Sequence, residues 1–244
     1  MHRGFFLPRI RPLALICAMF CVLKASDAGG GQPELLVCTP GNPNVQQIQQ
    51  TYETLVGQGT VLAFGRIRDV ENILATSPEV SMIAPALFFD ASMPQKIVLQ
   101  SKTGGELGQK YFIVVASDSV TKENIDSKKI GILDFLGREK LPKFVSDFFG
   151  ISSPILKRAN KVEDLLTMLG MEAVDAIIVS AAEYKKVKAD TKLPLKIIGE
   201  SSRPVPLLAL GIPASANAAK IKKLISEQPA LLSKLIEIDA WEAR

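Results

Sequence analysis

Short runs of four to six apolar residues recur along this chain, and segments with helical periodicity separate them. This alternation is typical of an α/β protein with mainly parallel sheets whose faces are covered by helices. The expected strands lie at 35–38, 80–84, 96–100, 111–116, 129–133, 155–159, 176–179, 195–198 and 207–210. The expected helices lie at 45–56, 67–74, 141–148, 162–170 and 181–187, with two more around 221–225 and 231–236.

The first 28 residues have the order of a secretory signal. Arginines at positions 3, 9 and 11 precede an uncharged run over 13–23, and small residues stand at 26 and 28. The run is about half of the ~20 residues that span a bilayer, which favours cleavage over a retained anchor. We therefore expect residues 1–28 to be a signal peptide and the remaining chain to be periplasmic, with a retained leader as the alternative.

The residues after this leader exclude several function classes. The only histidine is His2, so no Ser-His-Asp or Cys-His catalysis and no histidine-ligated metal is expected. Four of the 29 basic and one of the 25 acidic residues lie in the leader, which leaves a net charge near +1 and gives no basic footprint for nucleic acid. Cys38 is the one cysteine after the leader, and we interpret it as a buried apolar residue without a disulfide partner.

Known catalytic and cofactor motifs are not found. The sequence has no G-x-S-x-G, Walker A or H-E-x-x-H motif, no cysteine pair and no calcium loop. Gly57 and Gly59 lack the third glycine of a dinucleotide fingerprint, because Leu62 occupies its position. We expect no enzyme, no cofactor and no metal. A secreted hydrolase is the remote alternative, although no pair of carboxylates stands out for glycoside chemistry.

From residue 111 onward, the order and spacing of the segments resemble the type II periplasmic solute-binding fold. More narrowly, they resemble the phosphate/phosphonate ABC-transporter substrate-binding family. The resemblance covers about 130 residues, whereas 29–100 match loosely and look shortened. The segments that carry it are 111–119, 125–132, 161–166, 174–179 and 200–206, and 238–241 resembles the end of the family's C-terminal helix.

The resemblance implies two α/β lobes joined by two crossovers. Lobe one would comprise 29–116 and 204–244, and lobe two would comprise 117–203. The crossovers would lie at 116–119 and 201–206, where a hinge rotation would close the lobes on a ligand. The ligand would bind in the cleft where strand carboxyl ends and helix N-termini face each other.

One stretch departs from the family pattern. Phosphate and phosphonate binders of the family hold the oxyanion with a loop rich in serine, threonine and glycine. The matching stretch, 134–140, has one glycine and no hydroxyl. Asp134 would repel a dianion, Arg138 could hold a carboxylate or a single phosphate, and Phe135 would add an apolar wall. We expect a cleft that is less oxyanionic and more apolar than is usual in the family.

The candidate ligand-binding residues come from both lobes and from the return crossover, where Arg203 could bridge the lobes. Each has a structural alternative: turn and cap chemistry for Thr39 and Asn42, an N-cap for Ser180, and packing for the aromatic residues. The candidates are Thr39, Asn42, Pro85, Phe88 and Tyr111 in lobe one, and Phe135, Arg138, Asn160, Ser180 and Tyr184 in lobe two.

These expectations describe an exported, monomeric solute-binding protein. It would capture a small molecule between its lobes and deliver it to an inner-membrane transporter or receptor. The alternative is a stand-alone periplasmic sensor or interaction partner without a permease. The poor oxyanion loop and the shortened first lobe favour that alternative.

Overall fold

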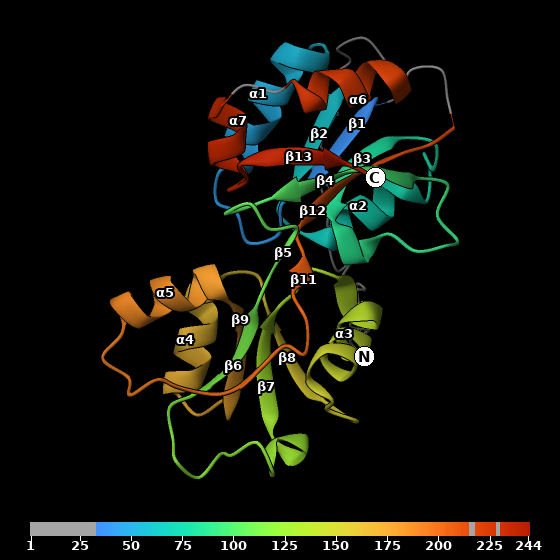
Figure 1. The fold of residues 1–244 in the computed structure, drawn as a ribbon. Helices are drawn as coiled ribbons and strands as arrows, with labels where there is room; N and C mark the ends of the chain where they lie inside the picture. The colour runs from blue at the N-terminus through green and yellow to red at the C-terminus, as the bar shows by residue number, and fades with distance from the viewer. Residues whose placement is uncertain (1–32, 215–217, 228–229) are drawn as a thin grey trace, which may run out of the picture. The chain divides into compact units, whose positions relative to one another are not determined.

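The computed structural model describes residues 33–214, 218–227 and 230–244. These residues belong to one unit, 31–244. They form two larger sheets flanked by helices (Figure 1). The expected signal peptide, residues 1–28, lies outside the described residues. Within the described ranges, no helix is long and apolar enough to cross a membrane.

The first sheet combines strands from the two ends of the described chain. Its order is β13-β4-β12-β3-β1-β2. β1 runs parallel to β2 and β3, whereas β12 is antiparallel to β3 and β4, and β13 is antiparallel to β4. The strands are β1 (Leu35–Cys38), β2 (Val61–Phe64), β3 (Ser81–Pro85), β4 (Lys96–Lys102), β12 (Leu208–Ile212) and β13 (Ala240–Ala243).

Helices cover both faces of the first sheet. Successive residues of β1 point to opposite faces and are buried on both. Leu35 and Val37 belong to an apolar cluster with residues of α1, α6 and α7. Leu36 and Cys38 belong to another that includes Ile67 of α2. Cys38 is fully buried as expected, and burial raises the pKa of its thiol. The helices are α1 (Val45–Val56), α2 (Ile67–Leu74), the 3-10 turn η1 (Ala86–Phe88), α6 (Ala218–Ser226) and α7 (Ala230–Leu235).

The second sheet is built from the middle of the chain. Its order is β10-β6-β9-β7-β8, and β7 runs parallel to β8 and β9. β6 is antiparallel to β9 and β10. Its elements are β6 (Tyr111–Val115), η2 (Ile125–Ser127), β7 (Lys129–Leu133), α3 (Gly137–Phe149), β8 (Ile155–Ala159), α4 (Val162–Gly170), β9 (Ala176–Ser180), α5 (Ala181–Asp190) and β10 (Lys196–Glu200).

The chain passes between the two sheets twice. It leaves the first sheet after Lys102 and returns to it at Leu208. In the two passages, β5 (Gly108–Gln109) and β11 (Val205–Pro206) pair antiparallel and lie between the larger sheets (Figure 1). A Cβ on Gly108 would lie 2.8 Å from the Val205 carbonyl oxygen, so the close approach of these strands requires glycine.

The expected position of the first passage, 116–119, is wrong. Tyr111 pairs with Ser180, and Val115 pairs with Lys196, so β6 belongs to the second sheet. The passage therefore lies at 103–110. A buried apolar strand looks the same in either sheet, because the local sequence does not specify its partners. The return passage, 201–207, overlaps the expected 201–206.

Three further differences from the expected elements follow from strand pairing. Both sheets are mixed, because the first strand after each passage, β6 or β12, runs antiparallel to its neighbours, and β13 runs antiparallel to β4. Strand β2 was not expected. Residues 238–241, which resemble the end of a helix, lead instead into β13, where Trp241 pairs with Ser101.

Candidate functional site

The edges of the two sheets at which parallel strands end carry most of the candidate residues. On the first sheet, Thr39 follows β1. On the second, Asp134 follows β7, Asn160 follows β8, and Ser180 ends β9 beside the first residue of β6, Tyr111. In open α/β sheets, ligands bind outside the carboxyl ends of the strands. The two edges therefore define the candidate site.

The turn after β1 brings these two edges into contact. Gly41 has φ +76°, and a Cβ on it would lie 3.5 Å from Leu133 Cδ1 and 3.7 Å from the carbonyl oxygen of Asn160. Leu133 ends β7 and Asn160 follows β8. The turn that begins at Thr39 thus packs against the part of the second sheet that carries Asp134 and Asn160.

A second contact joins α2 to the N-terminus of α3. A Cβ on Gly137, the first residue of α3, would lie 3.0 Å from Glu71 Oε1 and 3.4 Å from Ile67 Cγ2. Gly137 also has φ +80°, which favours glycine. The carboxylate of Glu71, in α2, therefore faces the helix end at which the resemblance implies an oxyanion.

Lys140 makes a third contact across the same boundary. Its ammonium donates to the Phe88 carbonyl oxygen at 2.5 Å and to Asp90 Oδ2 at 2.7 Å. It also lies 4.6 Å from the centroid of the Phe88 ring. Hydrogen bonds from Lys140 and Ser92 lower the pKa of Asp90 to about 2. We call Lys140, Asp90 and Phe88 the clasp.

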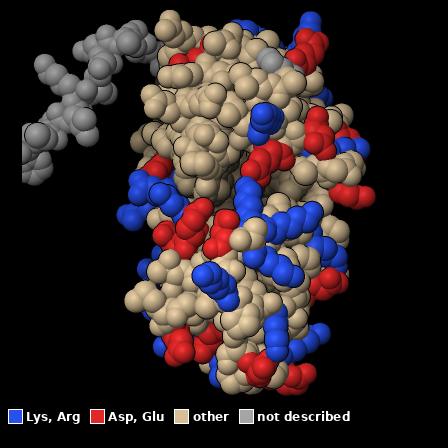
Figure 2. Space-filling view, turned by 90° about the vertical axis from the view of Figure 1, so that its left-hand side faces the viewer, with Lys and Arg blue, Asp and Glu red and all other residues tan. Residues whose placement is uncertain are grey.

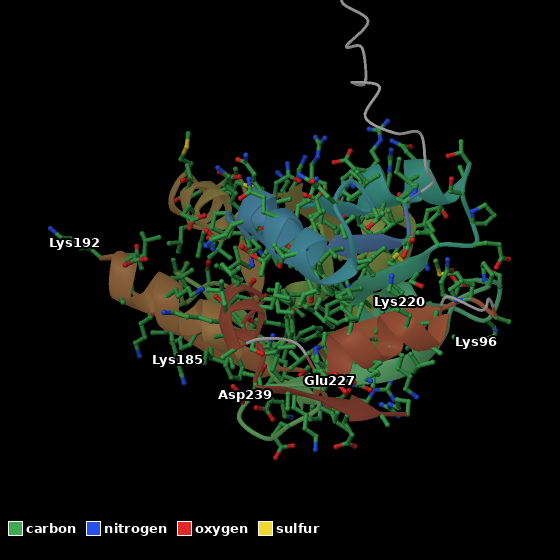
Figure 3. All side chains as sticks on the ribbon, turned by 90° about the horizontal axis from the view of Figure 1, so that it is seen from above. Lys96, Lys185, Lys192, Lys220, Glu227 and Asp239 are labelled. Carbon is green, nitrogen blue, oxygen red and sulfur yellow. The ribbon has the colours of Figure 1, made fainter. Side chains whose placement is uncertain are left out.

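A fourth contact is an exposed ion pair away from the clasp. Lys186 Nζ of α5 lies 3.0 Å from Glu237 Oε1, beyond α7. The neighbouring lysines of α5, Lys185 and Lys188, are exposed. Figure 3 shows Lys185 and Lys192 projecting outward on this side. The helices and turns that flank the first sheet therefore contact those that flank the second sheet at several separate places.

Aromatic rings form an apolar wall beside Asp134. The rings of Tyr111 and Phe135 stack at 5.8 Å with an interplanar angle of 26°. Phe144 meets both rings edge-on, at 5.8 Å and 5.1 Å. Burial, together with the charge of Glu183, raises the pKa of Tyr111. Phe135 and Phe144 are buried in an apolar core cluster, so packing, the structural alternative for the aromatic candidates, is present for Phe135.

Two buried oxygen atoms of the candidate site have no hydrogen-bond partner among the described residues. They are Thr39 Oγ1, on a side chain that is 5% exposed, and Asp134 Oδ1. The other carboxylate oxygen of Asp134 accepts a hydrogen bond from Arg158 Nη1 at 2.5 Å. Buried polar atoms are normally paired, so these two oxygens are exceptions and candidates for contact with a ligand.

Two candidate residues have local hydrogen-bonding roles. Asn42 Oδ1 accepts from the backbone N–H of Asn44, and its Nδ2 donates to the Leu235 carbonyl oxygen at 2.7 Å. Ser180 Oγ accepts from the backbone N–H of Glu183, whose carboxylate accepts from the backbone N–H of Ser180. This capping box begins α5. The structural alternatives for both residues are therefore present.

The other candidates lie in varied surroundings. Tyr184 packs edge-on against Phe112 at 5.8 Å. The Arg203 guanidinium lies 4.8 Å from the centroid of the Phe148 ring of α3, so it contacts the second sheet's own helix. Arg138 is exposed and makes no ion pair with a described residue. Pro85 is buried at the end of β3 opposite Leu208.

Sequence reasoning missed Glu71, Asp90 and Lys140 as contact residues. On sequence, each is a charged residue in or beside a helical or turn segment, and such residues are usually solvated. Only the folded arrangement brings them together. The departure from the family pattern at 134–140 was the one available signal, because that stretch includes Asp134 and Lys140.

Two cavities lie apart from the candidate residues. One, of about 470 Å³, is lined mainly by the end of α3, η2 and β10, including Phe148, Asp126 and Glu200. The other is a polar hollow of about 490 Å³ beside the start of α1. Among the described residues, no group of three or more histidine, cysteine, aspartate and glutamate side chains is placed to hold a metal ion.

Charged side chains of both signs are mixed over the face shown in Figure 2, mainly in its lower part. Neither sign forms a continuous field across this face. This agrees with the near-neutral composition of the chain after residue 28.

No family model and no curated protein matches this chain. Solved structures do match it. A Xanthomonas citri protein bound to ATP has a TM-score of 0.64 and 9% identity, and the match covers 87% of this chain and 91% of that one. The binding component of an ABC phosphonate transporter from Pseudomonas aeruginosa has a TM-score of 0.59 and 15% identity, with 88% and 82% covered.

The substrate-binding protein of an amino acid ABC transporter is also similar. It has a TM-score of 0.55 and 14% identity, and the match covers 85% of this chain and 98% of that one. At these identities, the likeness concerns the fold alone. The chain has the mixed α/β, two-lobe fold of periplasmic solute-binding proteins.

Proposed function

We propose that this chain is an exported solute-binding protein that captures one small molecule between two lobes and performs no bond chemistry. Lobe one comprises 33–102 and 208–244, and lobe two comprises 111–200. The lobes rotate about the passages at 103–110 and 201–207. The ligand is then handed to an inner-membrane transporter or receptor, and the binding protein works as a monomer.

The double passage with its paired strands, β5 and β11, carries this proposal. Two extended segments side by side can absorb a rotation without unpacking either sheet. They connect lobes whose strand ends face each other around Thr39, Asp134 and Asn160. The solved structures with this fold include proteins described as transporter binding components. Together, these observations support capture of a ligand rather than catalysis.

The structural surroundings support some candidate residues more than others as ligand contacts. Thr39 has a buried oxygen without a partner among the described residues, and Asn160 lies at the contact between the lobes. Tyr111 and Phe135 supply the apolar wall. We propose these four as the principal contacts. Asn42 and Ser180 take part mainly in local structure, because their side chains already bond the backbone.

A melting-temperature screen tests the proposal. The protein lacking residues 1–28 is heated with each member of a panel of amino acids, amines, sugars, nucleotides and phosphonates. A ligand at 100 times its dissociation constant stabilises the folded state by about 2.7 kcal/mol. We expect at least one compound to raise the melting temperature and native mass spectrometry to show one molecule per chain. The proposal would be overturned if no compound raises the melting temperature and no small molecule co-purifies with the protein from the native envelope.

Direct packing between the lobes favours a second candidate function. Phe88 of lobe one and Leu136 of lobe two are both 2% exposed and belong to one apolar cluster. A protein held closed by such contacts can serve as a sensor or docking partner without a permease. Affinity capture from solubilised membranes discriminates the two. A transporter permease supports the first function, whereas a receptor or enzyme without a permease supports the second.

A further inference from the structure

The candidate site holds two buried oxygen atoms without hydrogen-bond partners among the described residues. They are Thr39 Oγ1 and Asp134 Oδ1. Leaving such atoms unpaired in a protein interior is costly, so a ligand that forms hydrogen bonds with them gains affinity. The ionised Asp134 carboxylate can only accept, whereas the Thr39 hydroxyl can accept or donate. Gly41, two residues after Thr39, packs against Leu133, the residue before Asp134, and against the carbonyl oxygen of Asn160.

Carboxylates and basic side chains both lie at this place. Glu71 faces the N-terminus of α3, and it has no ion pair with a described residue. Two of the nearby basic groups are engaged, since Arg158 pairs with Asp134 and Lys140 pairs with Asp90, whereas Arg138, next to Gly137, is exposed and makes no ion pair with a described residue. Arg68 is exposed. Burial raises the pKa of Glu71, and the charges of Asp134 and Glu139 add to this effect, while Lys140 and Arg68 oppose it.

An anionic ligand group would meet the carboxylates of Glu71 and Asp134 in these surroundings. The N-terminus of α3 would attract an anion, but the carboxylate of Glu71 already lies beside Gly137. The loop before α3 supplies no hydroxyl group, and it begins with the carboxylate of Asp134. An ammonium or guanidinium group would be attracted by the same two carboxylates and would donate to the unpaired oxygens.

We propose that the ligand presents a cationic hydrogen-bond donor, an ammonium or guanidinium group, to Asp134 and Thr39, with Glu71 facing it. This inference rests on the proposed function and names its ligand class. Asp134 and Thr39 are binding residues, and Glu71 sets the preference for charge. The aromatic wall of Tyr111 and Phe135 lies beside the site and favours a ligand with an apolar part.

Isothermal titration calorimetry tests the ligand class with cationic, neutral and anionic probes. The cationic probes are L-arginine, agmatine and putrescine. L-citrulline matches arginine in shape but lacks its side-chain charge, and glutarate and inorganic phosphate are the anions. We expect at least one cationic probe to bind, citrulline to bind at least tenfold more weakly than arginine if arginine binds, and neither anion to bind.

Substitutions test which residues bind the cationic group of the probe. Asp134→Asn should weaken binding of the cationic probe at least tenfold, and Thr39→Val should weaken it several-fold. Because Asp134→Asn also breaks the pair with Arg158, Glu71→Gln provides a second variant at an exposed position, and it should weaken the same probe several-fold. Asp147→Asn, which removes an exposed carboxylate of α3 paired with Lys143, is the control and should leave affinity unchanged.

The outcomes separate this inference from the proposed function. Binding of phosphate or glutarate without binding of any cationic probe would overturn the inference and leave the proposed function standing. If none of the three cationic probes binds, the inference is also overturned. The proposed function is then tested separately by the melting-temperature screen and by mass spectrometry. Equal affinity of a cationic probe for the wild type, Asp134→Asn and Glu71→Gln would likewise overturn it.

Discussion

At the scale of single residues, the clasp ties lobe two to lobe one through one ammonium group. Lys140 reaches both a carbonyl oxygen and a carboxylate of the segment after β3. Its side chain is one-third exposed, so solvent weakens the attraction. We expect Lys140→Met to lower the free energy of unfolding by about 1 kcal/mol in urea titrations. Lys143→Met removes an exposed pair within α3 and should cost less. Equal losses in the two variants would contradict a role for the clasp.

The clasp also has a defined pH dependence. Its hydrogen bonds lower the pKa of Asp90 to about 2, below its unfolded value near 4. A lowered carboxyl pKa stabilises the folded state above the unfolded pKa, and this contribution is lost as the pH falls toward the folded pKa. We expect the stability difference between wild type and Asp90→Asn to be constant above pH ~5 and to shrink between pH ~4 and ~2. A difference that is unchanged at pH 2.5 would contradict this assignment.

A variant of Ser180 distinguishes a capping role of its hydroxyl from a role in ligand binding. Its hydroxyl accepts from the Glu183 backbone in the capping box. We expect Ser180→Ala to lower the free energy of unfolding by about 1 kcal/mol and to leave ligand affinity within about twofold of the wild type. A much larger loss of affinity without loss of stability would show that the hydroxyl contacts the ligand.

At the scale of elements, the two passages depend on close packing of β5 against β11. A methyl group on Gly108 would lie 2.8 Å from the Val205 carbonyl oxygen and 3.1 Å from Pro204 Cβ. We expect Gly108→Ala to destabilise the protein by about 1–3 kcal/mol, because the backbone must shift. Gly170→Ala in α4 adds a methyl group in ordinary contact, at 3.6 Å from Leu193, and is the matched control. A neutral Gly108→Ala would contradict the tight pairing.

The helices and most strands could be predicted from periodicity, because each buries a local apolar pattern. Pairing could not be predicted in the same way. The first passage was placed too late because Tyr111–Val115 looks equally apolar in either sheet. Strand β2 was missed, and the strand character of 240–243 depends on pairing with β4 rather than on local pattern.

For the candidate site, the sequence predicts which residues follow the strands but not which charged residues make contacts between the lobes. Residues directly after strands, such as Thr39 and Asn160, follow from topology and lie at the sheet edges that meet. Contacts made by surface-like charged residues, such as Glu71 and Lys140, depend on how the lobes approach each other. No local sequence pattern encodes that approach, so these contacts became visible only in the structure.

At the scale of the whole molecule, the central claim is that two lobes joined by two passages close around a ligand. Ligand binding should therefore change the distance between the lobes and leave each lobe's internal distances unchanged. The direct contacts at Gly41, Gly137 and Lys140 describe the approach that a bound ligand should stabilise.

Double electron–electron resonance measures this distance directly. Spin labels are attached at Glu79 of lobe one and Lys157 of lobe two, both exposed, after replacement by cysteine in a Cys38→Ala background. A second pair within lobe two, at Lys157 and Glu172, is the control. With the compound that most raises the melting temperature, we expect the distribution between lobes to narrow and shift, while the control pair stays constant. An unchanged distribution between lobes at saturating ligand would contradict the account.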